Sequence, residues 1–373
     1  MQILNRTLLP ALLVTLVVTA GALNGKPQGA AAASMPQKFV GDPVAEALGP
    51  EIMTAAVREG QLMYYAGTRM GPWLEKAGQK KNFEKRFGVK LEILELHPRE
   101  LLERVATEHA TGRKVADILQ QPSQRAILAH EMGVLEKWRP PSPGLEGIDK
   151  RFFLPELEGY WLPYFVSEQG ICYNAKMVPA GEAPQSYRDL LNPKWKGKIV
   201  SRDPRQSGGG AWQMLSIYHH PELGMEYLQK LHATVAPRIL PGSGSRVTCD
   251  AVLRGQAAIG LNARTFMLDD LPPDAPLKMV APKEGLSWLA IGNSLVKGAP
   301  HSNAAKVLLT WLYEVERLQD FTDRVAVVPH PKMKVNPPRW SLAKEEWMPG
   351  IPVKDLRRPN WFFKAMEKLY GIR

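Results

Sequence analysis

The chain has 373 residues, enough for two ordinary domains, and 45% of them are hydrophobic, so a sizeable core can be buried. Its formal net charge is +11, yet no run of five or more Lys or Arg residues and no interleaved aromatic-basic motif occurs. These features disfavour a nucleic-acid-binding protein and leave two readings of the charge, a solvated basic surface or a few basic residues collected in one cleft.

The first 34 residues are predicted to be a secretory signal peptide. Arg6 gives a positively charged start, an apolar run follows at 8–23, and small residues at 29–34 offer cleavage sites. The apolar run contains Pro10 and is short for a membrane-spanning helix. We therefore expect a soluble periplasmic protein that is cleaved near Ala33–Met35.

Strand and helix patterns alternate after a short N-terminal arm. Alternation of apolar residues predicts strands at 61–67, 89–96 and 115–123. Helical spacing predicts a helical segment carrying Trp73 and Phe87, and further helices at 99–113 and 124–135. This alternation indicates an α/β fold with a parallel sheet.

Two later segments look extended over more residues than one strand usually has. They are 160–174 and 277–300, and we interpret both as crossings between two lobes. Between them the pattern predicts strands and helices, namely 198–201, 211–219, 222–233 and a strand-turn-helix-strand unit at 237–266. A long helix at 302–318 and short C-terminal helices complete the chain.

The two cysteines, Cys172 and Cys249, fall in a strand pattern and at the start of a helix pattern. An oxidising compartment permits a disulfide between them. Two buried thiols are the favoured interpretation, because free cysteine is commonly buried. The spacing contains no paired CxxC metal motif, and we predict neither a bound metal nor a cofactor.

The stretch SRDPRQSGGGAWQML at 201–215 brings three glycines to the start of a predicted helix. Unpaired backbone N–H groups at such a turn point towards one place and can hold an anion. A nucleotide phosphate loop needs Gly-Lys-Ser/Thr, whereas Gly210 is followed by Ala211 and Trp212. The alternative is a plain turn in which Ser207 caps the helix.

The order of these motifs resembles the extracellular solute-binding proteins of bacterial ABC importers. Within that type 2 periplasmic binding fold, the branch of ferric-ion and organic-anion binders is most similar. NPKWKGKI at 192–199 is the most specific piece of the resemblance. The other pieces are GQLMYYAG, FEKRFGVKLEIL, GRKVADIL, VLRGQAAIGL and KGAPHSNAAKVLLTWL, together with the residues that flank 192–199.

The resemblance implies two α/β lobes, each a mostly parallel sheet flanked by helices, joined by extended hinge crossings. The expected division is a signal peptide at 1–34, a first lobe at 58–166 and 279–325, a second lobe at 167–278, and C-terminal helices at 326–373 that pack on the lobes. A monomer of this kind closes around a small ligand. It then delivers the ligand to a permease in the inner membrane that works with a cytoplasmic ATPase.

The residues at the expected cleft point to an anionic ligand. Ferric binders of this branch carry two adjacent tyrosines just after the strand that matches 257–261, where this chain reads NARTF. Arginine guanidinium groups instead match carboxylate, phosphonate and phosphate oxygens. The expected ligand-binding residues are Thr68, Arg69, Ser123, Arg202, Ser207, Gly208, Gly209, Ser243, Ser245, Asn262 and Arg264.

Three other functions are alternatives. One is a ferric-ion transport protein that uses non-tyrosine ligands or a synergistic anion. Another is a secreted hydrolase, which we disfavour because no GxSxG, HExxH or SxxK motif occurs. The third is a ligand sensor for a membrane receptor, which the sequence does not distinguish from a transport component. We expect a binding protein and not an enzyme.

Overall fold

The computed structural model describes residues 34–67, 69–241, 246–269, 271–335, 340 and 344–371. The expected signal peptide therefore lies outside the described residues, apart from Ser34. Three of the expected ligand-binding residues, Thr68, Ser243 and Ser245, lie outside them as well.

Within this part of the chain, ten strands form one sheet of order β2-β1-β3-β10-β5-β8-β6-β7, with β4 beside β10 and β9 beside β5. The strands are β1 Gln61–Ala66, β2 Lys90–Glu95, β3 Ile118–Pro122, β4 Leu135–Glu136, β5 Leu162–Asn174, β6 Ile199–Arg202, β7 Arg238–Leu240, β8 Ile259–Ala263, β9 Leu277–Val280 and β10 Ser287–Val296. β1 runs parallel to β2 and β3, and β6 runs parallel to β7 and β8. These two parallel sets are the parts of the sheet that belong to the first and the second lobe.

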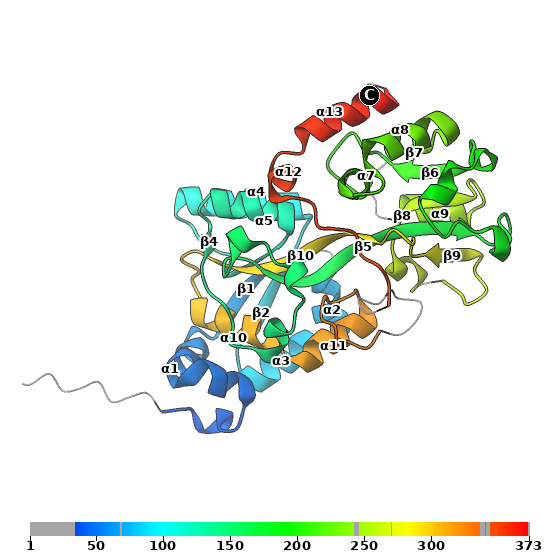
Figure 1. Ribbon diagram of the computed structural model, residues 1–373. Helices are drawn as coiled ribbons and strands as arrows, with labels where there is room; N and C mark the ends of the chain where they lie inside the picture. The colour runs from blue at the N-terminus through cyan, green and yellow to red at the C-terminus, as the bar shows by residue number, and fades with distance from the viewer. Residues whose placement is uncertain are drawn as a thin grey trace, which may run out of the picture.

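The helices lie in two groups around the two sets of strands (Figure 1). Those of the first part of the chain are α1 Pro43–Glu59, α2 Met70–Lys76, α3 Gln79–Phe87, α4 Pro98–Thr111, α5 Ser123–Glu131 and α6 Pro143–Glu146. Those of the second lobe are α7 Gly209–His219, α8 Gly224–Val235 and α9 Val247–Leu253. The chain ends with α10 Ser302–Leu312, α11 Val315–Arg324, α12 Val353–Arg357 and α13 Asn360–Tyr370.

Strand β5 passes from one lobe to the other, as predicted for 160–174. Its first part pairs antiparallel with β10 as far as Gln169, and its last part, from Gly170, pairs with β8 and β9. In Figure 1, β5 and β10 run across the middle of the molecule between the two groups of helices. The segment 277–300 is likewise extended, but it consists of β9 in the second lobe and β10 in the first. The two crossings run antiparallel to their neighbours, and the lobe boundaries near 167 and 279 stay our proposal.

The predicted single helix at 302–318 was wrong, because the chain divides it into α10 and α11. Ser142 Oγ donates a hydrogen bond of 2.6 Å to the carbonyl oxygen of Tyr313 at the end of α10. Gly144 packs so close that a β-carbon there would lie 2.0 Å from the same oxygen. Glu314 then takes an extended backbone conformation before α11 begins. The proline-rich loop at 137–147 thus ends α10, which local helix propensity does not reveal.

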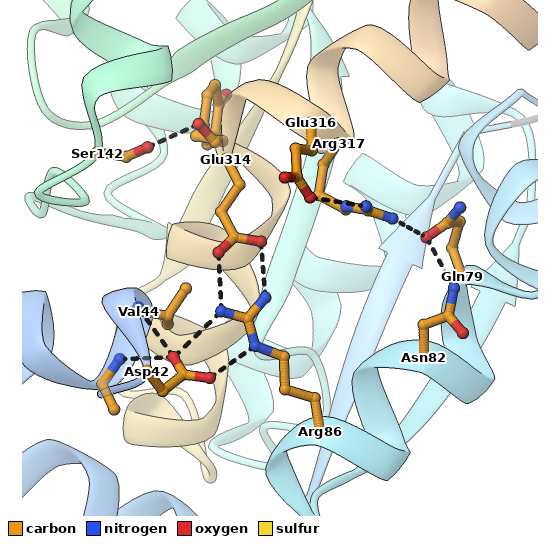
Figure 2. Close-up of polar contacts among 11 residues, drawn as sticks. Asp42, Val44, Gln79, Asn82, Arg86, Ser142, Glu314, Glu316 and Arg317 are labelled. Atoms are coloured by element: carbon orange, nitrogen blue, oxygen red, sulfur yellow. Dashed lines mark hydrogen bonds and ion pairs between the residues drawn. The ribbon is translucent and has the colours of Figure 1, made fainter. Parts of the chain in front are cut away.

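Arg86 of α3 ties this helix break to the start of α1 (Figure 2). Its Nε lies 2.7 Å from Asp42 Oδ2, and its Nη1 lies 2.8 Å from Glu314 Oε2. Asp42 also caps α1, because its Oδ1 accepts from the N–H groups of Val44 and Ala45 at 2.9 and 3.1 Å. Burial alone would raise the pKa of the Asp42 carboxyl, but the hydrogen bonds from Arg86 and the two amides lower it overall.

We expect Arg86→Met to destabilise the protein by about 2–3 kcal/mol, because two partly buried carboxylates lose their shared charged partner. Urea unfolding followed by circular dichroism measures this change. The matched control is Arg99→Met, since Arg99 and its partner Glu103 are exposed. That pair should contribute nothing measurable. Equal stability losses in the two variants would contradict the role given to Arg86.

The same network predicts an acid-sensitive stability. A carboxyl whose pKa is lower in the folded state contributes stability above its unfolded pKa and loses it as the pH falls through the folded pKa. Because the Asp42 pKa is lowered, its contribution should begin to decrease below about pH 4 and disappear as the pH falls through the lowered pKa of the folded state. Unfolding curves recorded between neutral and acidic pH should therefore fall less steeply for Asp42→Asn than for the wild type.

The C-terminal segment contacts both lobes. Arg357 of α12 forms an ion pair of 2.6 Å with Glu131 of α5 in the first lobe. His219 Nε2 of α7 in the second lobe lies 3.1 Å from Asp355 Oδ2 in α12. Figure 1 shows α12 next to α5 and α13 next to α8. The two C-terminal helices therefore lie across the side of the molecule where the lobes meet.

Candidate ligand-binding site

The loops after β1, β3 and β8 meet where the two lobes face each other. A cavity of about 110 Å³ lies between them. The first lobe and the crossing strands contribute most of its lining, and Arg264 reaches it from the second lobe: Gly67, Arg69, Pro98, Gln120, Pro122, Phe165, Ser167, Arg264 and Ile291. Open α/β sheets bind ligands at the carboxyl ends of their strands, and this cavity has that position.

A wider cavity of about 730 Å³ adjoins the first through Arg69, which lines both. Its charged lining is mostly basic: Arg69, Lys76, Arg246 and Arg324, with Asp269 as the acidic member. The guanidinium of Arg69 stacks on Phe266 of the second lobe, with 3.8 Å between Cζ and the ring centroid. This cation–π contact connects the two lobes next to the smaller cavity, which Arg69 also lines.

Arg264 follows β8 directly and points its side chain into the smaller cavity. Its Nε is buried and has no hydrogen-bond partner among the described residues. The pKa of Arg264 is lowered to about 10, chiefly by burial and also by the nearby Arg202, whereas Glu168 and Cys249 oppose the shift. A guanidinium with a buried, unused donor favours a ligand that brings negative charge.

Arg202 is the last residue of β6 and is buried, with 8% of its surface exposed. Burial lowers the pKa of its guanidinium as well. Its side chain lies against the start of α7, where a β-carbon at Gly209 would be 2.3 Å from Arg202 Nη1. The absence of a side chain at Gly209 thus lets this arginine approach the helix start, whereas a β-carbon at Gly208 would stay 3.6 Å away.

Asn262 has a supporting position in the structure. Its Oδ1 accepts a hydrogen bond of 3.0 Å from the backbone N–H of Arg202. Its Nδ2 donates to Gln213 Oε1 at 2.7 Å and to the backbone carbonyl of Gly209 at 3.2 Å. Its backbone φ is +65°, which an Asn tolerates better than most residues. Its amide is used by β6 and α7, so we now propose that Asn262 positions Arg202 and Gly209 and does not itself touch the ligand.

Two serines from the predicted set, Ser123 and Ser207, are not among the residues that line the two cavities. Ser207 is exposed, and the residue before α7 is Gly208, whose position has no side-chain cap. The alternative in which Ser207 caps this helix is therefore wrong. Ser123 is the buried first residue of α5, next to Pro122 of the cavity.

Three residues of the cavity region escaped the sequence analysis as ligand candidates. Glu168 of β5 is buried, and its Oε1 accepts from Thr265 Oγ1 at 3.0 Å, which holds the loop next to Arg264. Gln120 of β3 accepts the Gly67 N–H at 3.0 Å and so fixes the loop before Arg69. Ser167 of β5 lines the cavity. Polar residues inside strands that are buried on both faces are the sequence signal that could have identified these three residues.

The tyrosines of β1 are engaged inside the first lobe. Tyr64 donates a hydrogen bond of 2.6 Å to Asn293 Oδ1, and burial raises the pKa of its phenol well above the usual value. Tyr65 contacts Glu108 and Arg104, and burial together with Glu108 raises the pKa of its phenol to about 12. The part of the chain that the structure describes holds no group of three or more His, Cys, Asp or Glu residues suited to a metal ion.

We expect no tyrosinate-iron colour when ferric citrate is added. A phenolate ligand at Tyr64 or Tyr65 would have to form against a raised pKa and break existing hydrogen bonds. Visible absorption spectra with and without ferric citrate measure this. A coloured complex of one iron per protein that persists in the Tyr64→Phe variant would place iron elsewhere and contradict this account of the site.

A family model for bacterial extracellular solute-binding proteins matches residues 128–347, more than half of the chain. The chain belongs to this family. A periplasmic protein of Salmonella typhimurium named for 2-aminoethylphosphonate binding is 28% identical over 171 residues, which are 44% of this chain and 49% of that protein. The chain thus spans about half the length of the curated relatives it matches.

Solved structures of periplasmic binding proteins share the fold. AfuA from Actinobacillus pleuropneumoniae, with fructose-6-phosphate bound, superposes with a TM-score of 0.65 at 21% identity, over 84% of this chain and 99% of that one. Iron-bound HitA from Pseudomonas aeruginosa gives a TM-score of 0.65 at 18% identity over the same shares. The predicted two-lobed fold is confirmed by these likenesses. Among the described residues, no helix is both long and apolar enough to cross a membrane.

Proposed function

We propose that the protein is the substrate-binding component of an ABC importer and that it captures a small organic anion between its lobes. The observation that carries the proposal is Arg264, whose buried Nε lacks a partner among the described residues at a cavity between the lobes. Arg69 lines the same cavity, and Arg202 lies close enough to Arg264 to lower its pKa. Among the described residues, Glu168 is the acidic neighbour of Arg264, and Asp269 shares the wider cavity with Arg69. A cluster of guanidinium groups around an unused donor suits a phosphonate, a sugar phosphate or a carboxylate.

The family supports a binding function and not a catalytic one. The matched family model describes solute-binding proteins, and the solved structures that share the fold are binding proteins. The Salmonella relative is named for a phosphonate, and AfuA was solved with a sugar phosphate, so both ligands carry a phosphorus-centred anion. In our proposal the protein acts as a periplasmic monomer and passes its ligand to a membrane permease driven by an ATPase.

Isothermal titration calorimetry of the purified chain tests the proposal. The panel is 2-aminoethylphosphonate, fructose-6-phosphate, citrate and inorganic phosphate, with fructose as the uncharged match to fructose-6-phosphate. We expect at least one of the anions to bind with micromolar or tighter affinity and to be recovered unchanged. Binding of fructose as tight as that of fructose-6-phosphate, or turnover of a bound compound, would contradict the proposal.

We also expect the two lobes to close around the ligand, with the crossing at 166–170 and the segment 277–284 as hinges. A ligand that touches both lobes stabilises the closed form by its additional contacts. Small-angle X-ray scattering should give a smaller radius of gyration at saturation with the anion selected by calorimetry. An unchanged profile, from a free protein already shown by scattering to be open, would rule out closure.

A further inference from the structure

The two cysteines of the chain meet in the core of the second lobe. Cys172 lies in β5 and Cys249 in α9, and neither has more than 1% of its surface exposed. Both are free thiols, and their Sγ atoms lie 2.8 Å apart. Two sulfur atoms in simple van der Waals contact stay further apart, whereas a disulfide bond is about 2.0 Å long. The two sulfur atoms therefore lie closer together than packing alone allows, at a separation between contact and bond.

The surroundings of the pair hold β5 and α9 together. Asn174 Nδ2, two residues after Cys172, donates a hydrogen bond of 2.7 Å to the carbonyl of Val252 in α9. Gly260 of β8 pairs with Cys172, and a β-carbon at Gly260 would lie only 2.8 Å from Cys172 Sγ. The backbones that carry the two thiols are thus fixed on both sides, and the sequence contains no third cysteine to compete.

We propose that Cys172 and Cys249 form a disulfide that fastens α9 to β5. The proposal rests on this geometry and on membership of an extracellular family, whose members fold in an oxidising environment. It does not depend on the identity of the ligand. The cysteines are 77 residues apart in the sequence. Arg202 and Gly209 lie between them, so the bond would close a loop of the chain that contains both residues.

Oxidation of the two cysteines proceeds by thiol–disulfide exchange with a disulfide donor such as oxidised glutathione. One cysteine thiolate attacks a donor sulfur and forms a mixed disulfide, and the other cysteine then displaces the remaining donor thiolate. The two cysteine thiols lose two protons and two electrons, and the donor leaves as two thiols. Burial raises the pKa of the Cys172 thiol well above its usual value, so the exchange occurs before α9 packs on β5.

Mass spectrometry of the full chain tests the proposal. The protein is unfolded and refolded in a mixture of oxidised and reduced glutathione, quenched in acid, denatured and treated with N-ethylmaleimide. We expect no maleimide adduct and a mass lower by two hydrogens than that of the reduced chain, with two adducts after reduction. Two adducts without prior reduction, stable glutathione adducts, or a disulfide-linked dimer on a non-reducing gel would each overturn the proposal.

A second measurement separates the bond from simple packing of two thiols. The wild type refolded with the oxidising mixture should melt on the order of 5–10 °C higher than the wild type kept reduced, because the bond constrains the unfolded chain. The variant with both Cys172→Ala and Cys249→Ala should melt at one temperature in either buffer. Equal melting temperatures for oxidised and reduced wild type would overturn the claim that the bond fastens α9.

Discussion

Arg264→Ala should bind the anion selected by calorimetry at least tenfold more weakly than the wild type. Truncation of one partner of a desolvated arginine–anion pair costs about 2–5 kcal/mol, and about 1.4 kcal/mol already corresponds to a tenfold change. Arg264 is the natural choice because its side chain lines the cavity and its buried Nε has no hydrogen-bond partner in the described part of the chain. Isothermal titration calorimetry measures the loss.

One further variant and one stability measurement serve as controls for this result. Arg264→Lys should recover only part of the affinity, since an ammonium keeps the charge but lacks the planar fork of donors. The melting temperature of ligand-free Arg264→Ala should not fall, because removal of a partly buried charge with an unused donor relieves a desolvation cost. A change in affinity below twofold would exclude Arg264 as a ligand contact and move the assignment to Arg69 or Arg202.

Most of the fold was predictable because its signals are local. Alternating apolar residues marked β1, β2 and β3, and the unusual length of the extended stretch at 160–174 marked β5 as a crossing. The break between α10 and α11 was not predictable, since its causes come from Ser142 and Arg86, far away in the sequence. Contacts of that kind override the helix propensity of the segment itself.

The site was predictable only in part, for a similar reason. The position of Arg264 after a strand of the sheet indicated a place at the cleft, and the structure puts its side chain at the cavity. The role of Asn262 depends on its positive φ and on Gln213 of α7, neither of which a motif encodes. The meeting of Cys172 and Cys249 likewise depends on how α9 packs against β5.

The three glycines at the start of α7 should respond differently to replacement by alanine, and Gly210→Ala should be the most damaging. A β-carbon at Gly210 would lie 2.5 Å from the Arg202 carbonyl oxygen and 2.7 Å from that of Asp203. These are backbone atoms of the turn after β6, so the helix or the turn has to move. We expect a loss of about 3 kcal/mol in the free energy of unfolding, typical of overpacking in a closely packed place. Chemical denaturation measures it.

Gly209→Ala should instead keep its stability and lose affinity. Its β-carbon would meet Nη1 of Arg202 at 2.3 Å and Nε2 of Gln169 at 2.9 Å, and both atoms end flexible side chains that can move aside. Displacement of the Arg202 guanidinium should weaken anion binding by about tenfold, the equivalent of one charged hydrogen bond. Gly208→Ala is the matched control, because its φ of 164° is ordinary extended backbone and its β-carbon would stay 3.6 Å from Arg202. If Gly209→Ala binds the anion as tightly as Gly208→Ala does, Arg202 does not contact the ligand and the second-lobe half of the site is misplaced.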